Sequence, residues 1–113
     1  MADGILYHNP RCSKSRQALE LLQGRGLSPQ VVEYLKTPPD AATLKRLLGQ
    51  LGLSARDVLR KKEAAEAGID AKASEAVLIE ALAEHPIALE RPIFVHKGKA
   101  VVGRPPEKVL EIL

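Results

Sequence analysis

A chain of 113 residues, 45% of them hydrophobic, is long enough for one domain with a substantial core but too short for two. Its net charge of +3, from 17 basic and 14 acidic residues, is typical of an ordinary solvated surface. With one Phe, two Tyr and no Trp, little is available to stack on bases, so we expect no nucleic-acid partner. The single cysteine excludes an internal disulfide and a multi-cysteine metal site, and we expect neither a metal nor a tightly bound cofactor.

The sequence shows no secretory or membrane-spanning pattern. Residues 1–9 lack a basic start followed by a long apolar stretch. No apolar run approaches the ~20 residues of a membrane span. We therefore expect no membrane partner and a cytoplasmic location in which the thiol stays reduced. We also expect a monomer.

The first third of the chain has the pattern of a strand, a helix and a second strand. Residues 4–8 predict a short buried strand, and residues 13–23 carry apolar side chains on one helical face. Residues 30–35 are rich in β-branched side chains, which favour a strand. Two strands joined by such a helix should be parallel.

The middle of the chain, about residues 40–85, is expected to be a helical insertion. Leucines recur at helical spacing between Asp40 and Gly52. The charged run 61–67 is compatible with either a helix or a mobile surface segment. Ser74 is expected to cap a further helix, whose inward side chains would be Val77, Leu78 and Leu82.

The last third of the chain changes period. Residues 93–96 and 100–102 flank Lys97-Gly98-Lys99, which is typical of a tight β-hairpin. Pro105-Pro106 should begin a final helix, with inward side chains at Val109, Leu110 and Leu113. The order β-α-β, helices, β-β-α predicts an α/β, thioredoxin-like fold in a single domain, residues 1–113.

Cys12 lies where the first strand gives way to the first helix. Unpaired N–H groups and the dipole of a helix start favour negative charge, and Arg11, Lys14 and Arg16 add positive charge nearby. Such surroundings can lower the pKa of a thiol from ~8.5 to roughly 3.5–7.5. The alternative is a cysteine buried as a small hydrophobe, but its polar neighbours argue against that. We interpret Cys12 as a nucleophile.

Three arginines stand apart by their context. Arg60 follows an apolar pair at a helix end, whereas Arg91 and Arg104 each precede a proline beside the hairpin. In the predicted fold Arg91 and Arg104 would lie close to the first helix start and could face the thiol. Guanidinium forks suit tetrahedral oxyanions, although surface salt bridges are the open alternative.

Six segments occur in an order and spacing that resemble one family. They are Tyr7-His8-Asn9-Pro10-x-Cys12-x-x-Ser15-Arg16, Tyr34-Leu35 followed by Pro38-Pro39, Leu59-Arg60-Lys61, His85-Pro86-Ile87, Arg91-Pro92-Ile93 and Arg104-Pro105. Over essentially its whole length the sequence resembles the glutaredoxin-dependent arsenate reductases, the ArsC-type branch of the thioredoxin superfamily.

The resemblance implies roles for particular residues. Cys12 would be the nucleophile that attacks arsenate, and Pro92 would be the cis-proline of thioredoxin-like folds. His8 would either tune the thiolate or simply hydrogen-bond the loop. The arginines that would hold the arsenic oxyanion are Arg60, Arg91 and Arg104.

The missing second cysteine determines where the electrons come from. Reducing arsenate to arsenite takes two electrons, and Ser15 stands where a Cys-x-x-Cys motif would have its second thiol. An external thiol is therefore required. In the family this is glutathione, a co-substrate, with glutaredoxin clearing the mixed disulfide.

The sequence departs from the family pattern next to the cysteine. Arg11, Ser13 and Lys14 replace residues that are usually small. The added charge could help to capture an anion, or could reshape the rim that faces glutathione.

Two rival functions remain open. A general glutathione-dependent thiol oxidoreductase would act on disulfides and would have little use for three arginines. A regulator of the Spx type would bind RNA polymerase, but such regulators usually carry the Cys-x-x-Cys switch that Ser15 removes.

Overall fold

The computed structural model describes residues 3–113. These residues divide into two compact units. One unit comprises the chain up to Tyr34 and from Arg91 onward, and it holds the sheet and Cys12; the other is Leu35–Glu90. The single domain expected from the sequence stays a prediction. Among residues 3–113, no helix is long and apolar enough to cross a membrane.

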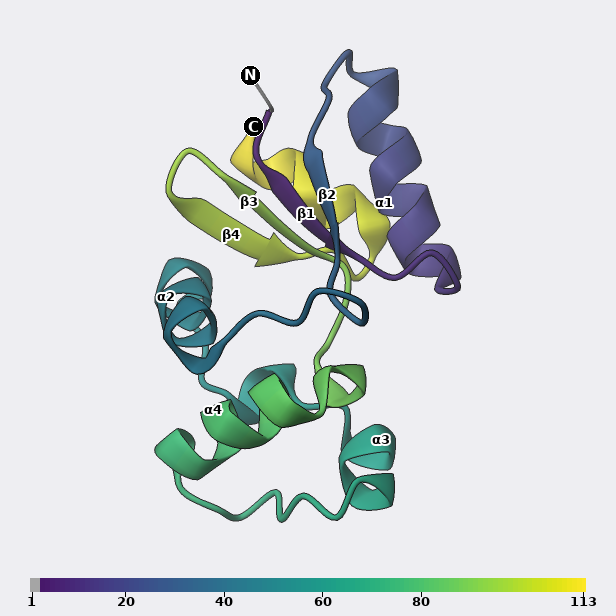
Figure 1. Cartoon of the computed structure of the whole chain (residues 1–113). Coiled ribbons are helices and arrows are strands. Elements are labelled where there is room, and N and C mark those ends of the chain that lie inside the picture. Colours follow the sequence, from purple (N-terminus) through teal and green to yellow (C-terminus); the bar gives the residue numbers. More distant parts are fainter. Residues whose placement is uncertain (1–2) are drawn as a thin grey trace. The chain divides into compact units, whose positions relative to one another are not determined.

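A four-stranded sheet forms the centre of the first unit. Its strands are β1 (Ile5–His8), β2 (Gln30–Glu33), β3 (Ile93–His96) and β4 (Lys99–Val102), in the spatial order β2-β1-β3-β4. Strand β1 is parallel to β2 and antiparallel to β3, which is antiparallel to β4 (Figure 1). This confirms the thioredoxin-like α/β prediction. Strand β2 is shorter than predicted, because the chain turns after Glu33.

Helix α1 (Ser13–Gly24) and the final 3-10 helix η3 (Pro106–Ile112) pack together against the sheet. Their shared core is aliphatic except for one aromatic ring. Its fully buried members are Leu6, Ala18, Leu22, Phe94 and Val109. The core fixes α1 against β1, and so fixes the start of α1 beside the end of β1.

The final helix differs from its prediction in type and in one inward residue. A 3-10 helix has three residues per turn, so Val109 and Ile112 align on one side and both pack on the core. The prediction that Leu113 faces inward was wrong, because its side chain is 41% exposed.

The hairpin between β3 and β4 has a two-residue turn. Lys97 and Gly98 have φ angles of 53° and 79°, the left-handed conformations that tight hairpin turns use. Strand β4 therefore begins one residue earlier than predicted, at Lys99.

The second unit is built from α2 (Ala41–Leu51), α3 (Lys61–Glu66) and α4 (Glu75–Glu84). Asp40 caps α2 by accepting from the Thr43 N–H at 2.8 Å, and Ser74 caps α4 by accepting from the Val77 N–H at 3.3 Å. The run 61–67, left open by the sequence, is largely the helix α3. The prediction that Val77 faces inward was wrong, because it is 55% exposed. The buried side of α4 is formed by Leu78, Ile79 and Leu82, and Val77 lies off that side.

Two 3-10 turns bring distant parts of the second unit together. They are η1 (Arg56–Val58) and η2 (Pro86–Ala88). The residues that follow them pair in an antiparallel bridge, in which the Arg60 N–H donates to the Ala88 carbonyl and the Glu90 N–H to the Val58 carbonyl, each at 2.7 Å. This pairing sets the Arg60 side chain beside Glu90.

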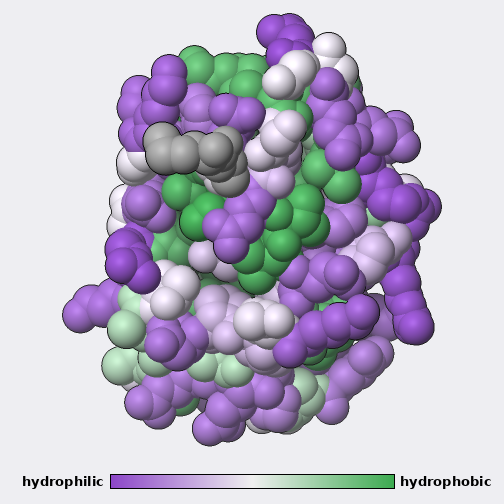
Figure 2. Space-filling model, turned by 45° about the horizontal axis from the view of Figure 1, so that its top comes forward, coloured by the Kyte–Doolittle hydropathy of each residue, from purple (hydrophilic) through white to green (hydrophobic). Residues whose placement is uncertain are grey.

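The outer surface is mostly hydrophilic in the face shown in Figure 2, with a group of apolar residues visible among the polar ones. The leucines differ widely in exposure. Leu22 is fully buried in the core, whereas Leu113 is 41% exposed.

We predict that Leu22→Ala lowers the free energy of unfolding by about 2–5 kcal/mol, because it removes buried apolar contacts and leaves a cavity. Leu113→Ala, the same change at an exposed site, should alter it by no more than about 0.5 kcal/mol. Urea unfolding of the two variants measures both quantities. Equal losses would contradict the described core.

Candidate functional site

A tight turn carries the chain from β1 into α1. The Cys12 N–H donates to the Asn9 carbonyl at 3.0 Å, and the Arg11 N–H donates to the Asn9 side-chain oxygen at 3.0 Å. Cys12 is the N-cap of α1, with extended backbone angles of φ −93° and ψ 122°. Its sulfur therefore stands beside the N–H groups of the first helical turn, which have no partner within the helix.

The surroundings of Cys12 favour its thiolate. Partial burial raises the pKa of the thiol, but hydrogen bonds from the Ser15 N–H, the Arg91 side chain and the Lys14 N–H outweigh it. The net effect holds the pKa of Cys12 below its usual value. Because the side chain is also partly exposed, a reagent can reach this thiol.

Arg91 is brought to the sulfur by the start of β3. Its guanidinium hydrogen-bonds Cys12, while its Nε and Nη1 atoms are buried and have no hydrogen-bond partner within residues 3–113. Buried donors normally have partners, so two open ones beside a thiolate indicate a place for an acceptor. The bond to the following Pro92 is cis, as the resemblance implied.

Arg104 lies beside Arg91 but is exposed. Its Nη1 donates to the Arg91 carbonyl at 3.3 Å, and the Gly103 N–H donates to the Pro92 carbonyl at 2.8 Å. A Cβ on Gly103 would come within 2.9 Å of the Pro92 ring and 3.0 Å of Val109. Gly103 therefore permits this close approach. The sequence analysis missed this role, although the position of Gly103 directly before Arg104-Pro105 could have indicated it.

His8 is bonded to the start of α1 through Ser15. The His8 Nδ1 and Ser15 Oγ atoms lie 2.6 Å apart, and the Asn9 N–H donates to the same oxygen at 3.0 Å. Both side chains are buried. Burial lowers the pKa of His8, and Arg16 lowers it further against the opposing effect of Glu33. His8 thus bonds the loop, and its tuning of the thiolate stays a prediction.

Arg60 belongs to the second unit, where carboxylates engage it. Its Nη1 lies 2.8 Å from Glu90 Oε1, and its Nε lies 3.3 Å from Glu63 Oε1. Burial lowers the pKa of Arg60, but these two carboxylates raise it by more, so the pKa lies above its usual value. The salt-bridge alternative holds for Arg60, whereas its role in binding an anion stays a prediction.

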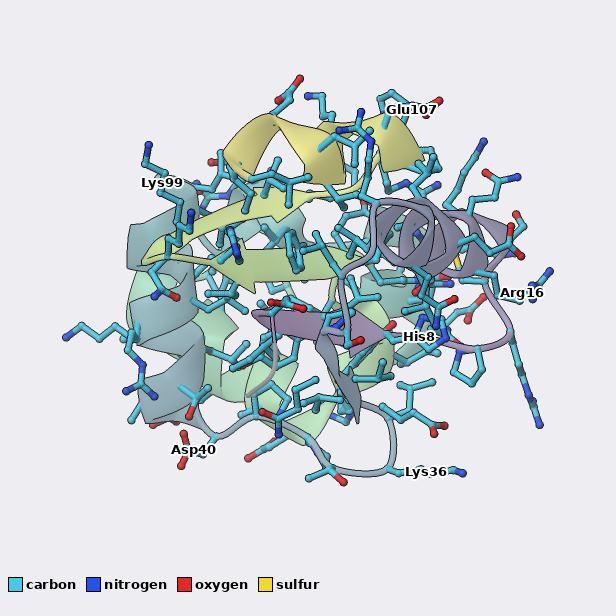
Figure 3. The ribbon with its side chains drawn as sticks, turned by 90° about the horizontal axis from the view of Figure 1, so that it is seen from above. His8, Arg16, Lys36, Asp40, Lys99 and Glu107 are labelled. Atoms are coloured by element: carbon cyan, nitrogen blue, oxygen red, sulfur yellow. The ribbon has the colours of Figure 1, made fainter. Side chains whose placement is uncertain are left out.

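The remaining cations of the motif are on the surface. Arg11, Lys14 and Arg16 are all exposed. Arg16 is held by the loop, since its Nη1 donates to the Pro10 carbonyl at 2.8 Å. In Figure 3 Arg16 and His8 lie at the same end of the sheet, and Lys99 lies at the opposite side of the view.

The four-stranded sheet, with its single cysteine at the N-cap of the first helix and a cis-proline before β3, defines a thioredoxin-like protein. More narrowly, the chain belongs to the ArsC family, whose model matches residues 7–112.

Relatives of known sequence or structure match nearly the whole chain. YfgD of Escherichia coli K12, described as uncharacterized, is 54% identical over 112 residues, which are 96% of this chain and 94% of that protein. An arsenate reductase of Neisseria meningitidis is 49% identical over 96% of both chains. A solved arsenate reductase from Vibrio cholerae has a TM-score of 0.89 and 51% identity over 96% of both chains.

We predict that alkylation of Cys12 by iodoacetamide follows an ionisation below pH ~8.5, the ordinary value for a thiol. Arg91→Gln should move this midpoint upward, because the thiolate loses a charged hydrogen-bond donor. Stopped-flow or mass-spectrometric rates between pH 5 and 10 give the midpoint.

Arg25→Gln is the matched control for that series. Arg25 follows the last residue of α1, about 18 Å from its start at 1.5 Å per residue, so its charge should hardly reach the sulfur. A wild-type midpoint at or above ~8.5 would contradict the described hydrogen bonds.

Proposed function

We propose that this protein is an arsenate reductase in which Cys12 is the nucleophile and external thiols are the reductants. The observation that carries the proposal is the Arg91 guanidinium, which bonds the sulfur and keeps two buried donors without partners within residues 3–113. A tetrahedral oxyanion that approaches the thiolate would supply acceptors for those donors. The relatives and solved structures described as arsenate reductases support arsenate as that oxyanion.

A second arginine of the same unit joins the proposed anion site. Arg104 hydrogen-bonds the backbone of Arg91, and its guanidinium is exposed to solvent on that side of the unit. An anion-binding role for Arg60 stays what the family resemblance implies, since Glu63 and Glu90 engage this arginine in the second unit. Positive charge offsets the charge of the bound anion and of the species that forms during attack.

The proposed first step is covalent. The Cys12 thiolate attacks arsenic, an S–As bond forms, and one arsenate oxygen leaves as water after taking up two protons. Arsenic remains pentavalent in this adduct. The N–H groups of Lys14 and Ser15, which stabilise the free thiolate, remain beside the sulfur throughout.

The two electrons come from two thiols. Cys12 supplies one sulfur, an external thiol supplies the other, and the pair becomes a mixed disulfide as arsenic is reduced to arsenite. A second external thiol then attacks the mixed disulfide and restores Cys12. No other cysteine exists in the chain, and Ser15, in the second position of the motif, is fully buried.

The reductant we propose is glutathione, with glutaredoxin resolving the mixed disulfide. This fits a thiol that cannot form an internal disulfide, and it fits a cytoplasmic location, where the glutathione pool is reduced. The open donors of Arg91 support this function over general thiol exchange, because the uncharged S–S group of a disulfide offers them no charged acceptor.

We predict arsenate-dependent NADPH oxidation in an assay coupled through glutathione, glutathione reductase and glutaredoxin, and its complete loss in Cys12→Ser. Arg91→Ala should reduce kcat/KM for arsenate at least about tenfold, since a lost charged hydrogen bond costs ~1.5–3 kcal/mol. Arg25→Ala, which removes an arginine at the far end of α1, should leave kcat/KM unchanged.

Circular dichroism and thermal unfolding are the controls that show whether each variant is folded. A folded Arg91→Ala protein with wild-type arsenate kinetics would refute the oxyanion site. Turnover of disulfides but not of arsenate would favour a general thiol oxidoreductase.

A further inference from the structure

Two exposed cations flank Cys12 and take no part in the chemistry described above. Arg11 directly precedes the cysteine in the turn, and Lys14 lies in the first turn of α1, two residues after the cysteine. Their charged groups form no ion pair or hydrogen bond within residues 3–113, unlike Arg16, whose guanidinium bonds the Pro10 carbonyl. Arg11 and Lys14 are here named the cationic rim.

The rim has no acidic counterpart beside it. The first turn of α1 holds no acidic residue, and between Asn9 and Leu19 the sequence has three cations and no carboxylate. Glu20 lies two turns into α1, and Glu33 is on β2, where it acts on His8. No carboxylate next to the rim along the chain therefore offsets its positive charge.

From this arrangement we infer that Arg11 and Lys14 select anionic reactants for Cys12 by accelerating their capture. The inference rests on the proposed role of Cys12 as a nucleophile, and it concerns any small anion that reacts with the thiolate, the arsenic oxyanion included. The open donors of Arg91 hold an anion at the sulfur; the rim acts earlier, on the encounter. Clustered charge of one sign raises the association rates of small ions by about 10-fold to 1,000-fold, and salt weakens the effect.

Paired alkylating reagents separate charge selection from thiol reactivity. Iodoacetate is anionic and iodoacetamide is neutral, yet both transfer a carbon to the same sulfur with loss of iodide. A change in the pKa of Cys12 alters both rates alike, so the ratio of the iodoacetate rate to the iodoacetamide rate reports how strongly the charges around the thiolate favour an anionic reagent. Neither rate requires arsenate, glutathione or glutaredoxin.

The test compares Arg11→Gln/Lys14→Gln with wild type at pH 7.5. At an ionic strength of about 0.01 M, where the Debye length is about 30 Å, we expect the rate ratio to fall about threefold to tenfold in this variant. In about 1 M salt, where that length is about 3 Å, the two proteins should have nearly equal ratios.

The control is Lys97→Gln/Lys99→Gln, which removes the same net charge from the hairpin turn. Both lysines are exposed, and Lys99 lies at the opposite side of the view from Arg16 in Figure 3. At about 0.01 M this control should lower the ratio by clearly less than the rim variant does, and at physiological ionic strength, where the Debye length is about 8 Å, it should keep the wild-type ratio. An equal fall in the control would show an effect of total charge and would overturn the inference, as would an unchanged ratio in the rim variant.

The outcome is independent of arsenate turnover. A ratio that falls in the rim variant alone supports anion selection by Arg11 and Lys14, even if the protein reduces no arsenate. In that case the proposed substrate would be wrong. Arsenate turnover with an unchanged ratio would instead remove the rim and leave the reductase in place.

Discussion

The constraint on which the site depends is the buried hydroxyl of Ser15. Its oxygen bonds both the His8 ring and the Asn9 N–H, so it fastens the end of β1 to the first turn of α1. Because Cys12 lies between Asn9 and Ser15, this pairing also holds the turn that places Cys12 at the N-cap of α1. Sequence analysis considered Ser15 only as the place of a missing second thiol, whereas the structure shows that its hydroxyl holds the turn that contains Cys12.

The β-α-β and β-β-α segments were predictable because their cores are strongly patterned. Leu6 and Phe94 fall on strands, and Leu22 falls on one face of a helix, where periodicity and burial agree. Two predictions of inward side chains were wrong. At Val77 tertiary packing buries a different side of the helix, and at Leu113 the final helix is a 3-10 helix and not an α-helix. Propensity alone does not register either effect.

The sequence predicted an ionised thiol at Cys12, but it could not tell which arginine lies beside that thiol and which is paired with carboxylates. Arg91 bonds the sulfur and keeps open donors, whereas Arg60 is engaged by Glu90 and Glu63. The difference arises from carboxylates that pair with Arg60 across a bridge between distant segments, which no local motif reveals. Gly103 was overlooked for the same reason, since the ring it accommodates belongs to Pro92.

The central claim is that the Cys12 thiolate and the Arg91 donors that would bind an anion form one site. Protection of Cys12 by arsenate against alkylation tests this claim most directly. The measurement is the rate of alkylation by neutral iodoacetamide as arsenate is added at constant ionic strength, in wild type and in Arg91→Ala. Our account predicts saturable protection in the wild type and little or none in Arg91→Ala. A wild-type rate that does not respond to arsenate would contradict it.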